Sequence, residues 1–194
     1  EYLQSHYATT AQMAATPLVA NPGSYAHYFD ANGPMDGSDD ASATGAYSVA
    51  VGSNAVASGD ESQAFGAGAH AYGTGDIAMG NGAVANSGSY GATSATAVGS
   101  GASASFAGAS AFGSGATAGT YYGTAIGSKA QATGKYSTAV GSGATASGNF
   151  GTALGKYASA SGNYSTAVGK YASASGVASS AFGYGAQATG TAST

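Results

Sequence analysis

Histidine, carboxylate and serine side chains are the groups in this chain that could support catalysis or hold a metal ion. His6, His27 and His70 show no HExxH or comparable ligand spacing. The run DGSDD at residues 36–40 lacks the ordered D-x-D-x-D-G calcium loop, and no Gly-Gly pair exists to begin a GGxGxD calcium-binding nonapeptide. The chain has no cysteine, which excludes thiolate zinc sites, a cysteine nucleophile and disulfides. We therefore expect no metal and no other cofactor.

The serines are abundant, but their surroundings do not favour nucleophilic catalysis. A Ser-His-Asp triad needs a buried acid that orients a histidine beside the serine. All three histidines and all eight acidic residues lie within the first 76 positions, and nothing in the sequence marks a pocket there. We predict that the protein is not an enzyme.

Charge is divided along the chain, although the net charge is only −4. The first 76 positions hold every acidic residue and no lysine or arginine, and the only basic residues are Lys129, Lys135, Lys156 and Lys170. An elongated molecule would have an acidic end and a weakly basic end. Four lysines are too few to neutralise the phosphates of a nucleic acid, so we expect no such partner. The sequence shows neither a signal-peptide pattern nor a run of about 18 apolar residues, and we expect a soluble mature form or fragment.

A fourteen-residue repeat organises most of the sequence. The unit reads A-[VILFM]-G-x-x-A-x-A-x-[G]-x-x-x-x, with glycine at position 10 in most copies but not in all, and we number its positions 1 to 14 from the first alanine. Glycine recurs within each unit and costs about 1 kcal/mol in a helix, so the unit fits two short strands joined by two glycine turns. Stacked units of this kind form a β-solenoid. The copies begin at Ala50, Ala64, Ala78, Ala97, Ala111, Ala125, Ala139, Ala153, Ala167 and Ala181.

Two departures from the repeat set the predicted domain organisation. The third copy is 19 residues long, and we place its five extra residues in a surface loop within residues 86–96. A degenerate copy at residues 36–49 extends the predicted β-roll to residues 36–194. Residues 1–35 do not match the repeat and hold all three prolines. Because the end coil of a solenoid has open strand edges, we favour a cap for residues 1–35, with a ligand-binding tip or a disordered leader as alternatives.

Side-chain alternation along each strand assigns the faces of the coil. Positions 1, 6 and 8 are alanine in all ten copies, and positions 13 and 1 share a face of small residues on the first strand. Two alanine faces fit a thin, flattened roll, in which a larger interior residue would cost about 1–3 kcal/mol by overpacking. Positions 7 and 9 are mostly Ser, Thr, Gln or Asn and form the polar, solvent-facing side of the second strand.

A row of larger apolar residues occupies position 2 and must point out of the roll. At about 4.8 Å per coil, this row makes an exposed stripe about 45 Å long, which a soluble monomer rarely leaves bare. We expect an oligomer seam, to which each identical subunit contributes the same row around a shared axis. The seam residues are Val51, Phe65, Met79, Val98, Phe112, Ile126, Val140, Leu154, Val168 and Phe182.

The repeat resembles the head repeat of the trimeric autotransporter adhesins of Gram-negative bacteria, the YadA-like head. Copies such as STAVGSGATASGNF (137–150) and STAVGKYASASGVA (165–178) carry the resemblance, which covers about residues 36–194. The resemblance implies an all-β fold, a left-handed parallel β-roll solenoid in a homotrimer. It also implies display on the cell surface, on the outer membrane, through a stalk and a C-terminal anchor. Neither the stalk heptads nor the anchor is in the sequence, so we expect an isolated head whose membrane contact runs only through the absent anchor.

Two sets of side chains are candidate contact sites. Lys156-Tyr157 and Lys170-Tyr171 repeat at positions 4 and 5 of neighbouring coils. Aromatic rings supply contact area and lysine supplies direction, so these four residues are our candidate ligand-binding site, with a solvated turn as the alternative. A second set should stack along one edge, as a structural ladder or as a contact, because it fills position 12 of four consecutive coils: Tyr122, Tyr136, Phe150 and Tyr164.

These features predict a non-enzymatic adhesin head that contributes to cell adhesion and virulence. Its expected partners are an extracellular matrix protein such as collagen or fibronectin, host cells, other bacteria or abiotic surfaces, as the resemblance implies. Weak contacts would be multiplied by the symmetry of the trimer. One alternative is an ice-binding β-solenoid, although positions 7 and 9 show no regular threonine rows. The other is a passive spacer head that projects a different binding domain.

Overall fold

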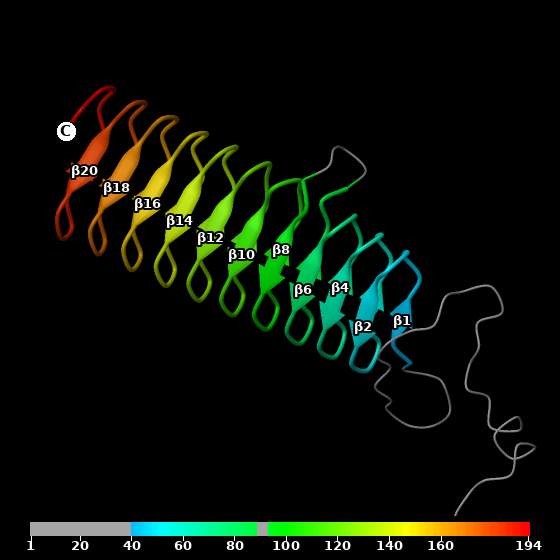
Figure 1. Cartoon of the computed structure of the whole chain (residues 1–194). Helices are drawn as coiled ribbons and strands as arrows, with labels where there is room; N and C mark the ends of the chain where they lie inside the picture. The colour runs from blue at the N-terminus through cyan, green and yellow to red at the C-terminus, as the bar shows by residue number, and fades with distance from the viewer. Residues whose placement is uncertain (1–39, 89–92) are drawn as a thin grey trace, which may run out of the picture.

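The computed structural model describes residues 40–88 and 93–194, which form a solenoid of stacked two-strand coils without any helix (Figure 1). Odd-numbered strands make one 11-stranded sheet and even-numbered strands make a 10-stranded sheet, both in sequence order. We call them the odd sheet and the even sheet. The odd sheet contains β1 (Ser42–Ala43), β3 (Val56–Ala57), β5 (His70–Ala71), β7 (Val84–Ala85), β9 (Ser103–Ala104), β11 (Thr117–Ala118), β13 (Gln131–Ala132), β15 (Thr145–Ala146), β17 (Ser159–Ala160), β19 (Ser173–Ala174) and β21 (Gln187–Ala188). The even sheet contains β2 (Val49–Val51), β4 (Gln63–Phe65), β6 (Ile77–Met79), β8 (Thr96–Val98), β10 (Ser110–Phe112), β12 (Thr124–Ile126), β14 (Thr138–Val140), β16 (Thr152–Leu154), β18 (Thr166–Val168) and β20 (Ser180–Phe182).

All strand pairs are parallel and in register, so equivalent repeat positions lie side by side on neighbouring coils. Ala139 pairs with Ala153 in the even sheet, for example, and Ala146 pairs with Ala160 in the odd sheet. The all-β parallel solenoid predicted from the repeat is therefore confirmed. The predicted segment 1–35 lies outside the described residues.

Glycine stands at the first turn of every coil and at the second turn of most coils, where neighbouring coils approach one another closely. Gly141, at position 3, has φ 129°, and an added Cβ would lie 2.6 Å from the carbonyl carbon of Gly155 on the next coil. An added Cβ at Gly148, at position 10, would collide with the carbonyl oxygen of Gly162. Side chains at these corners would push the stacked backbones apart.

Alanine fills the space between the two sheets. The alanines at positions 1, 6 and 8 are buried in every described copy, except that Ala186 in the last coil is only partly buried. Small polar residues at position 13, such as Ser137 and Ser165, are buried in the same layer. The interior is therefore filled mainly by methyl groups and small hydroxyl side chains, as the alternation predicted, and the largest fully buried side chain of the described residues is that of Asp76.

The extra residues of the third copy are held by a buried carboxylate. Ile77 of β6 pairs with Thr96 of β8, an offset of 19 residues, so the insertion lies between β7 and β8. Asp76, at position 13, is fully buried. Its Oδ2 accepts hydrogen bonds from the backbone N–H groups of Gly73 (2.7 Å) and Ser87 (2.9 Å), and its Oδ1 accepts one from Ala95 N–H (2.7 Å). Asp76 thus ties both ends of the inserted loop to the preceding turn.

Candidate functional site

The apolar side chains at position 2 point out of the even sheet along its whole length. Ile126, Leu154 and Phe182 keep 41%, 42% and 61% of their surface exposed, whereas the intervening valines are half-buried. In-register pairs such as Ile126 with Val140 and Val140 with Leu154 make the row continuous. The structure confirms the outward direction that the alternation predicted for these side chains. The role of the row as a subunit seam stays a prediction.

A hydroxyl row runs beside the apolar row, and the sequence reasoning missed it. Position 14 lies two residues before position 2 and therefore on the same outer face of the even sheet. Its members pair in register across six consecutive coils, namely Thr96, Ser110, Thr124, Thr138, Thr152 and Thr166, and Ser180 continues the row. The recurrence of Thr or Ser every 14 residues at position 14 is the sequence signal of this row.

The Lys-Tyr pairs lie on the turn that leads from the even sheet to the odd sheet. The rings of Tyr157 and Tyr171 stack with centroids 5.5 Å apart and planes 10° apart. The Nζ atom of Lys156 lies 5.2 Å from the centroid of Tyr157, and that of Lys170 lies 5.1 Å from the centroid of Tyr171. Both lysines and both tyrosines are exposed. The structure brings together all four residues predicted to bind a ligand.

Tyr184 is a fifth member of this patch, which sequence reasoning missed. Its ring lies edge-to-face with Tyr171, with centroids 6.0 Å apart and planes 86° apart, and it is 77% exposed. Lys170 Nζ is 5.7 Å from its centroid, so this ammonium contacts two rings. Tyr184 occupies position 4, one residue before the position of the other two tyrosines, and only the stacking of the coils shows that the three meet. We call Lys156, Tyr157, Lys170, Tyr171 and Tyr184 the Lys-Tyr edge.

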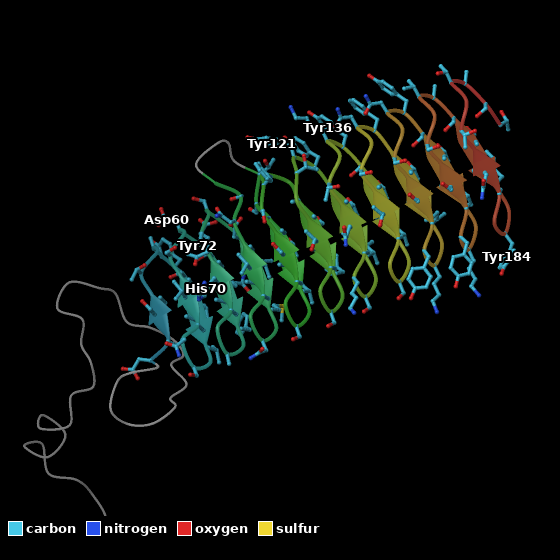
Figure 2. All side chains as sticks on the ribbon, turned by 180° about the vertical axis from the view of Figure 1, so that it is seen from behind. Asp60, His70, Tyr72, Tyr121, Tyr136 and Tyr184 are labelled. Atoms are coloured by element: carbon cyan, nitrogen blue, oxygen red, sulfur yellow. The ribbon has the colours of Figure 1, made fainter. Side chains whose placement is uncertain are left out.

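The predicted position-12 ladder forms on the opposite edge. Its rings stack with centroids 5.1–5.3 Å apart and planes within 6°, in the order Tyr122, Tyr136, Phe150 and Tyr164. Figure 2 shows Tyr136 on one edge of the roll and Tyr184 on the other. Each ladder residue has a positive φ, between 54° and 59°, which turns its side chain outward at the corner. The stacked faces leave mainly ring edges and hydroxyls to solvent.

Other polar side chains make local hydrogen bonds, although the buried hydroxyls of Ser62, Ser137 and Ser165 have no partner among the described residues. Tyr72 Oη and His70 Nδ1 are hydrogen-bonded at 2.6 Å on the outer face of the odd sheet (Figure 2). Asp60 Oδ1 accepts a hydrogen bond from Ala46 N–H at 2.9 Å. Within residues 40–88 and 93–194, no three His, Cys, Asp or Glu side chains gather as a metal site would require. His6 and His27 lie outside the described residues.

The described part of the chain contains no helix that is long and apolar enough to cross a membrane. Because the coils stack in register, the exposed rows and edges of the solenoid are each built from equivalent positions of successive coils.

Comparisons with known proteins identify the repeat. The model of the YadA head domain repeat matches residues 39–55, 43–69, 57–83, 71–87, 91–116, 121–144, 132–158, 146–172 and 174–194. Among solved structures, the collagen-binding domain of the Yersinia adhesin YadA is similar, with 25% sequence identity and a TM-score of 0.40 over 79% of this chain and 68% of that chain. A comparison with curated protein sequences finds no match. Because the repeat model matches most of the chain, in phase with coils whose alanine cores the structure shows, the chain belongs to the family of YadA-like heads of trimeric autotransporter adhesins.

Proposed function

We propose that this chain is a non-enzymatic adhesin head, displayed as a homotrimer on a Gram-negative outer membrane, which attaches the cell to an extracellular matrix protein. The observation that carries the proposal is the match to the YadA head repeat along most of the described solenoid. The left-handed winding and the three-fold assembly are properties of the family that we extend to this chain.

The exposed apolar row supports assembly around a shared axis. The interior of one roll contains only small side chains, so a single chain buries little apolar surface. Burial contributes about 25 cal/mol for each Å² of apolar surface removed from water, and the row at position 2 is a continuous supply of such surface along the even sheet. Cyclic symmetry would bring the same row from each subunit to the axis and supply the missing core.

Collagen is the first ligand to test, because the similar solved domain is described as collagen-binding. Fibronectin, host cells, other bacteria and abiotic surfaces are the further targets. The Lys-Tyr edge is our candidate contact, since its rings are exposed and already held in one arrangement by stacking. Each trimer would present it three times, which multiplies a weak contact by avidity.

A matrix-protein binding array with the purified head tests the proposal. The variant Y157N/Y171N removes the stacked rings; asparagine suits the left-handed turn, as Asn54 stands at the same repeat position with φ 54°. The matched control is Y136N, which removes a ring with the same backbone conformation, φ 58°, from the opposite edge. We expect matrix binding by the parent head, a loss in Y157N/Y171N and none in Y136N. Absence of binding to every matrix protein and cell type would refute the adhesin proposal in favour of a passive spacer.

Ice binding is a second candidate function, favoured by the hydroxyl row found beside the apolar row. Half-buried threonines recur at one coil spacing on the outer face of the even sheet, with aliphatic side chains next to them, and form a regular array. This face cannot both bind ice and form the subunit seam. Thermal hysteresis in a solution of monomeric chain would support ice binding, and its absence from a trimeric head would exclude it.

A further inference from the structure

Three of the four lysines lie on one edge of the roll. Lys129, Lys156 and Lys170 are exposed residues of the turns that lead from β12 to β13, from β16 to β17 and from β18 to β19. The fourth, Lys135, is exposed on the opposite edge, in the turn from β13 to β14. Most of the positive charge therefore lies on one edge of the roll, the edge that carries the Lys-Tyr edge residues.

The two central ammonium groups are held in place by aromatic rings. Lys156 lies over Tyr157, while Lys170 lies between Tyr171 and Tyr184 at 5.1 and 5.7 Å from their centroids. Cation–π contact at such distances restricts long lysine side chains that would otherwise sample many rotamers. A ligand that meets these ammonium groups has less side-chain entropy to remove on binding.

No carboxylate side chain of the solenoid lies near these ammonium groups. The last acidic residue in the sequence is Asp76, which belongs to the turn before β6, whereas Lys156 and Lys170 follow β16 and β18. A symmetric trimer around an axis along the solenoid would place equivalent coils of the subunits at the same height. The described carboxylates of a second copy would therefore also lie several coils away from these lysines. In-register stacking puts the two lysines on adjacent coils, about 4.8 Å apart along the axis, where like charges repel. An external anion would remove this repulsion.

We propose that the Lys-Tyr edge binds an acidic polysaccharide, with sulfate or carboxylate groups on Lys156 and Lys170 and sugar rings beside the tyrosines. This inference rests on the proposed adhesin function and names the class of ligand for its contact site. The tyrosine hydroxyls supply donors and acceptors for sugar hydroxyls, and Tyr184, at 77% exposure, offers a ring for the apolar face of a pyranose. The linear arrangement along the solenoid axis suits a chain whose anionic groups recur. Nucleic acid fits less well, because three lysines neutralise few phosphates.

Binding to immobilised heparin, measured by biolayer interferometry with the intact head, tests the inference. Hyaluronan supplies carboxylates without sulfates, dextran supplies neutral sugar, and poly-glutamate supplies carboxylates without sugar. The test variant is K156S/K170S, because serine stands at this repeat position in other coils, for example Ser128 and Ser142. The control is K135N, which removes one lysine charge from the opposite edge and is suitable because Asn149 and Asn163 stand at its repeat position; its effect is compared with half of the effect of K156S/K170S on the free energy of binding. Circular dichroism checks that every variant keeps the parent fold.

We expect heparin to bind, dextran not to bind, and K156S/K170S to weaken heparin binding about tenfold, within the range of about twofold to thirtyfold that two exposed ion pairs contribute together. K135N should change it less than about twofold. If hyaluronan also binds, the edge recognises carboxylated as well as sulfated polysaccharides. If hyaluronan does not bind, the edge recognises only sulfated ones, and both results agree with the proposal. The proposal is overturned if heparin does not bind, if K135N weakens binding as much as K156S/K170S, or if poly-glutamate binds as tightly as heparin. A head that binds collagen but not heparin contradicts only this inference, whereas a head that binds nothing contradicts the adhesin function itself.

Discussion

Replacing Asp76 with asparagine should destabilise the solenoid at the inserted loop. The fully buried carboxylate accepts three backbone hydrogen bonds, at 2.7, 2.9 and 2.7 Å, from Gly73, Ser87 and Ala95. An asparagine side chain has the same shape but only one acceptor oxygen. If that oxygen takes the place of Oδ2, the new NH2 group faces the N–H of Ala95, and these two donors meet without an acceptor between them.

The cost follows from the hydrogen bonds lost and weakened. A hydrogen bond to a charged acceptor contributes about 1.5–3 kcal/mol, and a buried unsatisfied group costs about 1–3 kcal/mol. The neutral amide is cheaper to bury than a carboxylate, which offsets part of this loss. We expect a net loss of about 2–4 kcal/mol in the free energy of unfolding. For a chain of this size that corresponds to a decrease in Tm of roughly 5–15 °C.

Thermal unfolding followed by circular dichroism at fixed protein concentration measures this decrease. The matched control is D60N, since Asp60 is exposed and accepts a single backbone hydrogen bond, from Ala46 at 2.9 Å. Asparagine keeps that bond, so its Tm should change by no more than about 2 °C. An unchanged or raised Tm in D76N, with the loop intact, would refute the assignment of Asp76 as the clamp of the insertion.

Two further substitutions test the packing of the coils. G148A should prevent the normal stacking, because its Cβ would collide with the backbone of the next coil. G82A is the control, because an added Cβ there meets open space, and its free energy of unfolding should fall by only about 1–2 kcal/mol from the φ of +63°. Urea unfolding measures both variants, and equal losses of stability would contradict the steric argument. F150A breaks two ring stacks, both with centroids 5.1 Å apart, and should lower the free energy of unfolding by about 1–3 kcal/mol and reduce the near-UV circular dichroism of the tyrosines. Alanine is tolerated here, since Ala178 occupies the same repeat position with φ 54°. An unchanged spectrum would show that the ladder does not form.

The phase of the repeat made most of the fold predictable. Invariant alanine at positions 1, 6 and 8 requires a thin interior, and the structure buries these residues between two parallel sheets. The outward direction of Leu154 and its equivalents follows from the same alternation. The stacking of Tyr136 on Phe150 was also predictable, because identical positions of in-register coils must lie side by side.

Features that break the repeat could not be predicted from its consensus. Asp76 stands where other coils have serine, alanine or glycine, and its burial follows only from the loop that it binds. Tyr184 occupies a different repeat position from Tyr157 and Tyr171, so the sequence alone gave no reason to group it with them. Its perpendicular contact with Tyr171 depends on the directions of the side chains at the corner, which periodicity does not specify.

The oligomeric state of the head tests the central claim, that the apolar row at position 2 is a subunit seam. Sedimentation equilibrium at micromolar concentration measures it directly. A homotrimer of the 18.2 kDa chain should have a mass near three times that value, and L154D, which places a charge in the middle of the row, should shift the population to the single-chain mass. A parent chain that sediments as an 18.2 kDa monomer would contradict the seam and with it the account of how so thin a roll is stabilised.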